Sequence, residues 1–304
     1  MQRTPLALAL LVALTTPSAF AQTATAPAET RVDPGTANKD ARTLDTVVVT
    51  GTRVSDRTVA ESTAPIDIIT PEVLESTGTT ELATALSRAL PSLNFPRPAI
   101  TDGTDAVRPA QLRGLAPDQV LVLVNGKRRH TTALINLNGS QGRGSSPVDL
   151  NAIPVSAIER VEVLRDGASA QYGSDAIAGV VNIVLKGSGG GGSLSAGGGQ
   201  YSAGDGRQWN AGGDVGIDFA DRGFIHFAAQ GGHQDQTDRA KPYLGKVEQR
   251  YGDPEIDAGA ASYNAEFSPA EGITFYSFAN YSKRDVLSNG YFRAAADDRN
   301  RPEI

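Results

Sequence analysis

The second half of the chain alternates polar and apolar residues over segments of about ten residues. In "WNAGGDVGIDF" (209–219) the polar residues Asn210, Asp214 and Asp218 all fall on even positions. The odd positions are Trp209, Ala211, Gly213, Val215, Ile217 and Phe219. Successive side chains of a β-strand point to opposite faces of the sheet, so this pattern predicts strands with one polar and one apolar face. Further strand candidates are "GFIHFAAQGGHQ", "GAASYNAEFSP" and "GITFYSFANYSKR".

The connections between these segments differ in length. The turns "DR" and "PAEG" are short, whereas residues 235–257 form a long polar connection. Alternating strands with short turns at one end and long loops at the other are typical of an outer-membrane β-barrel. One face of a soluble β-sandwich alternates in the same way, so the pattern alone leaves both architectures open.

The number of strands favours an incomplete barrel. Residues 187–304 hold about five strand candidates, whereas the smallest single-chain barrels have eight strands. We therefore expect an open, curved sheet that is the N-terminal part of a barrel in a longer protein.

The N-terminus has the features of an export signal. Arg3 precedes the apolar run from Leu6 to Leu14, and Ala19-Phe20-Ala21 is a small-x-small cleavage site, so residues 1–21 are predicted to be a cleaved signal peptide. The apolar run is too short to cross a bilayer. Residues 22–44 are rich in Ala, Thr, Pro and charge and are predicted to be a disordered linker. No later segment has the length of a membrane-spanning helix, so a membrane role would fall to strands.

The composition excludes several classes of function. The chain has no cysteine and a net charge of −6, with no basic run longer than "GKRRH", so nucleic acid is not an expected partner. The three histidines lack the spacing of a zinc site, and we expect no metal site and no cofactor. No GxSxG, P-loop or dinucleotide-binding pattern is present, so no catalytic residue is assigned and the chain is not expected to be an enzyme.

Residues 55–186 are predicted to form a small α+β domain. "APIDIIT" is a short strand, and Thr70-Pro71-Glu72 begins a helix. "TELATALSRAL" places Leu82, Ala85, Leu86, Ala89 and Leu90 on one helical face before Pro91. "QVLVLVNG" is a buried strand that ends in a tight Asn-Gly turn, and "RVEVL" and "AIAGVVNIVLK" are two more strands.

Three segments carry a family resemblance. They are "DTVVVTGTR" (45–53), "LRGLAPDQVLVLVNGKR" (112–128) and "IPVSAIERVEVLRDGASAQYGSDAIAGVVNIVLK" (153–186). Together they resemble the TonB-dependent outer-membrane receptors, which actively transport iron-siderophore complexes, cobalamin and some saccharides.

The resemblance implies an α+β plug domain (55–186) followed by the first antiparallel strands (187–304) of a transmembrane barrel with 22 strands in full. An iron-siderophore complex is the solute that the family most often transports. Transport of a saccharide or of cobalamin, or a soluble secreted binding module, remain alternatives. The plug is expected inside the barrel on the periplasmic side, with lipid around the barrel.

The resemblance also gives residues 45–54 a role. Asp45, Thr46, Val47, Val48, Val49 and Thr50 match the TonB box, with residues 51–54 as its flank. In the family, TonB and its inner-membrane energising complex capture this segment as an added β-strand. The alternative is that Val47–Val49 begin the sheet of the plug.

Other residues are assigned by the resemblance alone. Arg113 and Arg165 match two plug arginines that pair with barrel glutamates, although Asp166-Gly167 replaces the Gly-Pro that often follows the second arginine. Substrate contacts are expected from the segments 94–105 and 130–147, which could equally fill space against the wall. The candidates are Phe95, Arg97, His130 and Arg143.

Overall fold

The computed structural model describes residue 50 and residues 64–79, 81–96, 107–137, 142–241 and 251–289. The predicted signal peptide (1–21), the linker (22–44), residues 45–49 and Arg97 lie outside these ranges.

A five-stranded sheet forms the centre of the plug region. Its strand order is β1-β6-β7-β4-β5, with β4 and β7 parallel and the other neighbours antiparallel. The strands are β1 (Ile66–Ile69), β4 (Val120–Val124), β5 (Lys127–Arg128), β6 (Ile158–Leu164) and β7 (Gly179–Leu185). The apolar runs predicted all three longer strands, although β6 begins two residues earlier than "RVEVL".

Both faces of this sheet are covered. Val120, Val122 and Val124 belong to the larger hydrophobic cluster, and Leu121 and Leu123 to a smaller one on the opposite face. A strand buried on both faces carries a continuous apolar run, as "VLVLV" does.

Two helices pack on the larger cluster. Helix α2 (Pro71–Ser76) has Pro71 in its first turn, but the side chain of Thr70 makes no capping hydrogen bond. Helix α3 (Leu82–Ala89) buries Leu82, Ala85 and Leu86, as the helical period predicted, and also Ala83, which the period did not predict. The predicted Ala89 and Leu90 are only partly buried. The helix ends before Pro91, which cannot continue a helix.

Shorter elements complete the plug region, and one of them, η7, lies in the second half of the chain. They are β2 (Leu93–Asn94), β3 (Gln111–Leu112), α4 (Ser169–Tyr172) and the 3₁₀ turns η3 (Pro117–Gln119), η4 (Leu150–Ala152), η5 (Val155–Ala157), η6 (Ser174–Ala176) and η7 (Ala220–Arg222).

The predicted Asn-Gly turn joins β4 and β5. Asn125 and Gly126 have φ angles of 48° and 73°, and the flanking residues Val124 and Lys127 are paired. A two-residue hairpin of this type needs positive φ at both central positions, which Asn and Gly tolerate best.

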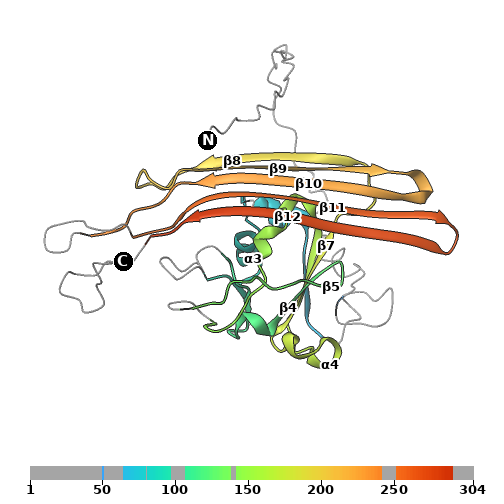
Figure 1. Ribbon diagram of the computed structural model, residues 1–304, viewed down its shortest axis with the longest axis horizontal. Helices are drawn as coiled ribbons and strands as arrows, with labels where there is room; N and C mark the ends of the chain where they lie inside the picture. The colour runs from blue at the N-terminus through green and yellow to red at the C-terminus, as the bar shows by residue number, and fades with distance from the viewer. Residues whose placement is uncertain are drawn as a thin grey trace, which may run out of the picture. The chain divides into compact units, whose positions relative to one another are not determined.

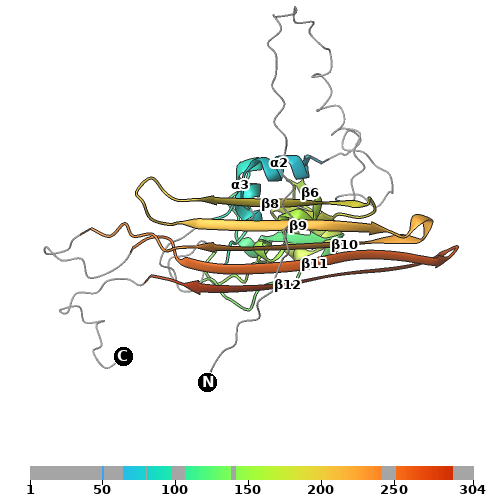
Figure 2. The same cartoon turned by 90° about the horizontal axis from the view of Figure 1, so that it is seen from above.

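The second half of the chain forms one antiparallel sheet, here called the wall sheet. Figure 1 shows its five strands side by side in sequence order, β8 to β12, and Figure 2 shows the same order after a quarter turn. They are β8 (Gly191–Gly199), β9 (Gln208–Asp218), β10 (Gly223–Gln234), β11 (Glu255–Ala270) and β12 (Ile273–Leu287). Within the described ranges β8 and β12 pair only with β9 and β11, so the sheet is open, as expected.

The strands extend beyond their predicted limits where a neighbour supplies hydrogen bonds. β11 begins at Glu255 instead of Gly259, because Ile256 and Asp257 pair with Gln234 and His233 of β10. The sequence places these residues in the long polar connection, because their own composition does not predict a strand.

The alternation sorts the side chains of the wall sheet as the sequence predicted. On β9 to β12 the even-numbered residues point toward the plug, and His226, Ala228, Ala260 and Ser262 are buried there. The odd-numbered residues point away, and Val215, Ile217, Phe227, Phe267 and Phe275 are exposed. No helix in the described ranges is both long and apolar enough to cross a bilayer.

Candidate functional site

Several contacts between the inward face of the wall sheet and the plug are made by the amides of asparagine side chains. The Asn125 Nδ2 donates to Asn264 Oδ1 at 3.2 Å, and the Asn264 Nδ2 donates to the carbonyl of Lys186 at 3.0 Å. The Asn280 Nδ2 donates to the carbonyl of Ala152 at 3.1 Å, and its Oδ1 accepts from Arg129 at 2.5 Å. The neutral bonds among these each contribute only about 1 kcal/mol, because water can replace them, whereas the bond from the charged Arg129 contributes roughly 1.5–3 kcal/mol.

A second row of contacts holds residues 149–156 of the plug. The Arg284 Nη1 lies 3.1 Å from Asp149 Oδ2, and the Val155 N–H donates to Gln230 Oε1 at 3.0 Å. The Ser156 hydroxyl donates to the carbonyl of Gly213 at 3.0 Å. Strands β9, β10 and β12 therefore all bind this one plug segment.

The position of Arg129 affects the pKa of its guanidinium group. Burial lowers the pKa of the Arg129 guanidinium, and the nearby Asp149 carboxylate opposes that shift. Arginine nevertheless remains protonated at any physiological pH.

One buried ionic cluster connects the end of the plug to the wall. The Lys186 Nζ lies 3.1 Å from Asp214 Oδ1, and the His226 Nε2 lies 2.7 Å from Asp214 Oδ2. The Ser193 hydroxyl also donates to Asp214. The Asp214 side chain is 3% exposed, so three donors around it compensate for the loss of water.

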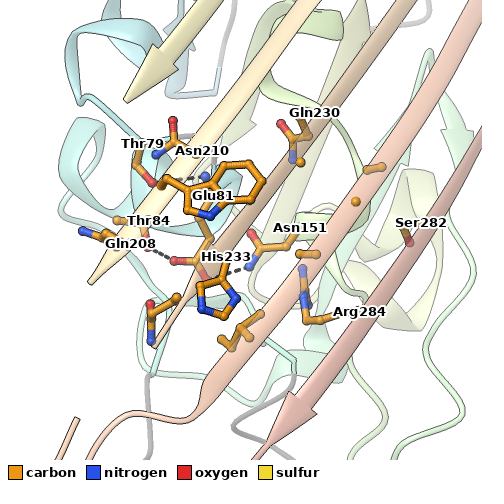
Figure 3. Close-up of a pocket in the computed structure, with 18 of the residues that line it drawn as sticks. Thr79, Glu81, Thr84, Asn151, Gln208, Asn210, Gln230, His233, Ser282 and Arg284 are labelled. Atoms are coloured by element: carbon orange, nitrogen blue, oxygen red, sulfur yellow. Dashed lines mark hydrogen bonds between the residues drawn. The ribbon is translucent and has the colours of Figure 1, made fainter. Parts of the chain in front are cut away.

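A cavity of about 370 Å³ lies between the plug and strands β9 to β12, at the strand ends nearest the long connections. Figure 3 shows its labelled side chains, which come from the start of α3, from the plug segment at Asn151 and from the wall strands. The lining includes Gln208, Asn210, Gln230, Gln234 and Asn151. This surface of amides suits a polar, oxygen-rich solute or a layer of water.

Glu81, one of the charged residues that line the cavity, is already paired. Glu81 Oε1 accepts from Arg108 Nε at 3.0 Å and from Asn151 Nδ2 at 2.8 Å, and the Thr84 hydroxyl donates to Oε2. Glu81 therefore joins α3 to the segment that the wall holds. Within the described ranges no group of three or more His, Cys, Asp or Glu side chains could hold a metal ion.

The outward face of the wall sheet carries an apolar band. Leu194 on β8 and Tyr281 on β12 are 89% and 72% exposed, and Phe267 and Phe275 lie near the short β11–β12 turn. Toward the long connections the band ends at a polar row, in which His233 pairs with Asp257 across the strands.

The height of this band can be estimated along β11. From Phe267 to Asp257 the strand rises roughly 33 Å, at about 3.3 Å per residue. If the strands had the tilt of about 40° found in transmembrane barrels, this length would give a height of roughly 25 Å, which is that of their apolar band.

Arg113 and Arg165, the two predicted plug arginines, lie at strand ends on the plug surface. Arg113 Nη1 is 3.7 Å from Asp166 Oδ1, and Arg165 Nε is 2.5 Å from Asp67 Oδ2. Their described carboxylate partners thus belong to the plug. The predicted pairing with barrel glutamates stays a prediction.

The candidate substrate residues lie in different environments. Phe95 is buried in the larger hydrophobic cluster, whereas His130 and Arg143 are exposed. His130 and Arg143 belong to one loop, whose arms are joined by hydrogen bonds from Thr132 N to the Pro147 carbonyl and from Asn136 N to the Ser145 carbonyl. Their contact with substrate stays a prediction.

Of the predicted TonB box only Thr50 is described. It is 1% exposed, and both its N–H and its hydroxyl donate to Glu162 of β6.

Sequence reasoning assigned no role to the residues that join plug and wall. Asp214 already stood on the polar parity of "WNAGGDVGIDF", and Asn264 and Asn280 stand on the same parity of their strands. An inward polar residue on an alternating strand was the signal that could have found them.

Comparison with known proteins agrees with this architecture. Residues 58–180 match the family described as "TonB-dependent Receptor Plug Domain". The plug and the antiparallel strands that follow it resemble the start of the barrel of these receptors. Residues 58–180 thus match the plug domain of the TonB-dependent receptors, and the chain is similar to siderophore receptors of that kind.

Two curated relatives cover about half of this chain. "Probable TonB-dependent siderophore receptor PirA" of Acinetobacter baumannii is 34% identical over 143 residues, which is 47% of this chain and 18% of that protein. "Vitamin B12 transporter BtuB" of Vibrio vulnificus is 35% identical over 150 residues, 49% of this chain and 22% of that protein. The chain thus spans about a fifth of the length of these relatives.

Solved structures share the fold over a larger part of the chain. The siderophore receptor PirA from Acinetobacter baumannii aligns over 79% of this chain and 35% of its own, with a TM-score of 0.56 and 24% identity. The ferric enterobactin receptor PfeA in complex with BCV-L6 aligns over 73% and 33%, with a TM-score of 0.57 and 22% identity.

Proposed function

We propose that this chain acts in TonB-dependent active transport of a scarce, large solute across the outer membrane, most specifically an iron-siderophore complex. The observation that carries the proposal is the two-sided wall sheet, which holds a plug by polar contacts on one face and exposes an apolar band on the other. A plug that must move inside a barrel needs contacts that water can replace, and the amides Asn125, Asn264 and Asn280 provide them.

The proposed location is the outer membrane, reached after cleavage of the signal peptide at residues 1–21. The exposed apolar band supports contact with lipid, because a water-soluble protein rarely exposes so many large apolar side chains together. The same band argues against the alternative of a soluble secreted binding module. Outer-membrane fractionation with heat-modifiable migration, and a mature N-terminus at Gln22, are the expected outcomes.

The proposed partner is TonB with its inner-membrane energising complex. Asp45–Thr50 would pair with it as an added strand through backbone N–H and C=O groups. The proposal assigns no chemical reaction to the chain.

The names of the relatives support the choice of substrate. Relatives named as siderophore receptors and as vitamin B12 transporters match at similar identity, so cobalamin is the second candidate. A saccharide has no such support.

The deciding experiment measures energised uptake of radioactive iron-siderophore complexes, with radioactive cobalamin in parallel. The cells are an iron-starved strain that lacks its own copy of the gene and carries either the original gene or a variant. Deletion of residues 45–50 is expected to abolish uptake and leave binding to cells intact. An equal deletion of residues 30–35, in the predicted linker, is the matched control and should leave uptake unchanged. Uptake that survives the deletion of 45–50 would contradict the proposed coupling.

A further inference from the structure

We propose that the cavity between the plug and strands β9 to β12 is a binding subsite for an anionic, oxygen-rich part of the transported solute, and that it favours ferric complexes of catecholates over those of hydroxamates. This inference rests on the proposed transport function and names the chemical class of the solute.

Small side chains on the inward face of the wall sheet make room for the cavity. Gly232 of β10 pairs directly with Ala258 of β11, and both line the cavity together with Ala260. The volume of about 370 Å³ falls within the range of roughly 300–1,000 Å³ that small-molecule sites occupy. The cavity is therefore large enough to hold one oxygen-rich part of a larger solute.

Three polar side chains of the wall sheet are available to such a solute. Gln230 already accepts a hydrogen bond from the plug backbone at 3.0 Å. The side chains of Gln208, Asn210 and Ser282, which Figure 3 labels, make no hydrogen bond to another residue of the described ranges. Amides and hydroxyls both donate and accept hydrogen bonds, so these three side chains can bind oxygen atoms of a solute.

The charged side chains that line the cavity leave one arginine without a carboxylate. Glu81 and Asp149 are the two carboxylates of the lining, and they are paired with Arg108 and Arg284. Arg88 of α3 also lines the cavity, and its Nη1 donates to a backbone carbonyl at 2.6 Å. Among the described residues no carboxylate forms an ion pair with Arg88, so its other N–H groups can bind anionic oxygens.

A further arginine adds to the positive charge beside the cavity. Asp149 lies 3.1 Å from Arg284, and its carboxylate also acts on the guanidinium group of Arg129. Two arginines therefore share one carboxylate of the lining. Such a surplus of one sign of charge attracts a solute of the opposite sign.

This surplus distinguishes two kinds of iron complex. Three catecholates bring more negative charge than one ferric ion neutralises, whereas three hydroxamates balance the charge of the ion. Both complexes present oxygen atoms that amides and hydroxyls can bind, so the neutral side chains do not discriminate between them. Arginine discriminates, because its hydrogen bonds to ionised oxygens are roughly twice as strong as bonds between neutral groups.

The test measures binding without transport. Outer-membrane preparations come from a strain whose other receptors for these complexes have been deleted, and the probes are radioactive iron bound to a tricatecholate or to a trihydroxamate chelator. The original protein is expected to bind the tricatecholate complex about tenfold more tightly, the effect of one hydrogen bond to a charged group. Arg88→Gln should remove this preference and leave the affinity for the trihydroxamate complex unchanged. Arg222→Gln, in the exposed η7 turn at the other end of the wall strands, is the matched control and should keep the preference.

Filling the cavity is the second arm of the test. Ala258→Leu places a larger side chain on the inward face of β11 and should weaken the binding of the tricatecholate complex about tenfold or more, because the solute then meets a clash. Ala261→Leu, on the outward face of the same strand, should bind as the original protein does. Tricatecholate binding that Ala258→Leu leaves unchanged would overturn the cavity as the subsite.

The remaining outcomes also decide. Equal affinity of the original protein for the two complexes, or a preference that survives Arg88→Gln, would overturn the inference. Failure to bind either complex would overturn it as well, whereas energised uptake of cobalamin would still support the proposed transport. Should Ala258→Leu fail to fold, the comparison of Arg88→Gln with Arg222→Gln decides alone, because both replace exposed side chains.

Discussion

The ammonium group of Lys186, one residue beyond plug strand β7, lies 3.1 Å from the carboxylate of Asp214 on wall strand β9. The same carboxylate binds His226 of β10 at 2.7 Å. The plug is thus fixed to the wall by a buried charge at the point where the chain passes from one to the other.

Replacement of this lysine tests the strength of the link. Lys186→Met is expected to lower the free energy of unfolding by about 2 kcal/mol, because Asp214 then keeps only Ser193 and His226 as described partners. The midpoint of the heat-induced shift in gel migration measures this change. The control is Lys283→Met, which breaks the exposed Lys283–Asp285 pair and should cost under about 1 kcal/mol. Equal shifts for both variants would contradict a special role for Lys186.

Gly216 on β9 is predicted to tolerate no side chain. A Cβ there would lie 2.7 Å from the Gly189 carbonyl and 2.8 Å from His226 Nδ1. Gly216→Ala should therefore destabilise the protein by about 1–3 kcal/mol, the usual cost of overpacking. Gly231→Ala on β10 is the control, because its nearest atom would be 3.6 Å away. A midpoint unchanged by Gly216→Ala would show that the ring of His226 can move aside.

Local sequence signals predicted the elements well. The helical period of α3, the apolar run of β4 and its Asn-Gly turn each depend on residues close in sequence, and all three were found as predicted. The parity of Asp214 also placed it on the polar face of its strand, although parity alone did not say that this face points toward the plug.

Contacts between distant segments could not be predicted in this way. The approach of His226 to Asp214 depends on the register that pairs His226 with Gly216. The early start of β11 depends on its neighbour β10, and the Thr50–Glu162 contact joins residues 112 positions apart. A single sequence contains none of these registers explicitly, although it contains the polar residues that they bring together.

The two plug arginines give a prediction about permeability. Arg113 and Arg165 are half-exposed, so replacing either with alanine should cost under about 1 kcal/mol of stability. If they also pair with barrel glutamates, as the family resemblance implies, each variant should raise the entry of large antibiotics several-fold. The zone of growth inhibition measures this entry, with Arg222→Ala in the exposed η7 turn as control. Zones identical to that of the unmodified protein would make both residues ordinary surface charges.

The contact between the β8–β9 connection (200–207) and the β10–β11 connection (235–254) is predicted to be sensitive to acid. Asp205 accepts hydrogen bonds from both terminal nitrogens of Arg239, with Nη2 to Oδ1 at 2.8 Å, and from the Asp238 N–H at 3.1 Å. The bond from Arg239 is the main reason that the pKa of the Asp205 carboxyl falls to about 2. Because the folded pKa lies below the unfolded value of about 3.9, the contact is fully stabilising above that pH and is lost as the pH falls toward about 2.

Arg239→Gln should return the carboxyl to titration near its ordinary value, whereas Arg207→Gln, the control, should not. The carboxyl infrared band, taken as the difference from Asp205→Asn across this pH range, measures the titration. Titration of Asp205 near pH 4 in the unmodified protein would show that Arg239 does not bind it in solution.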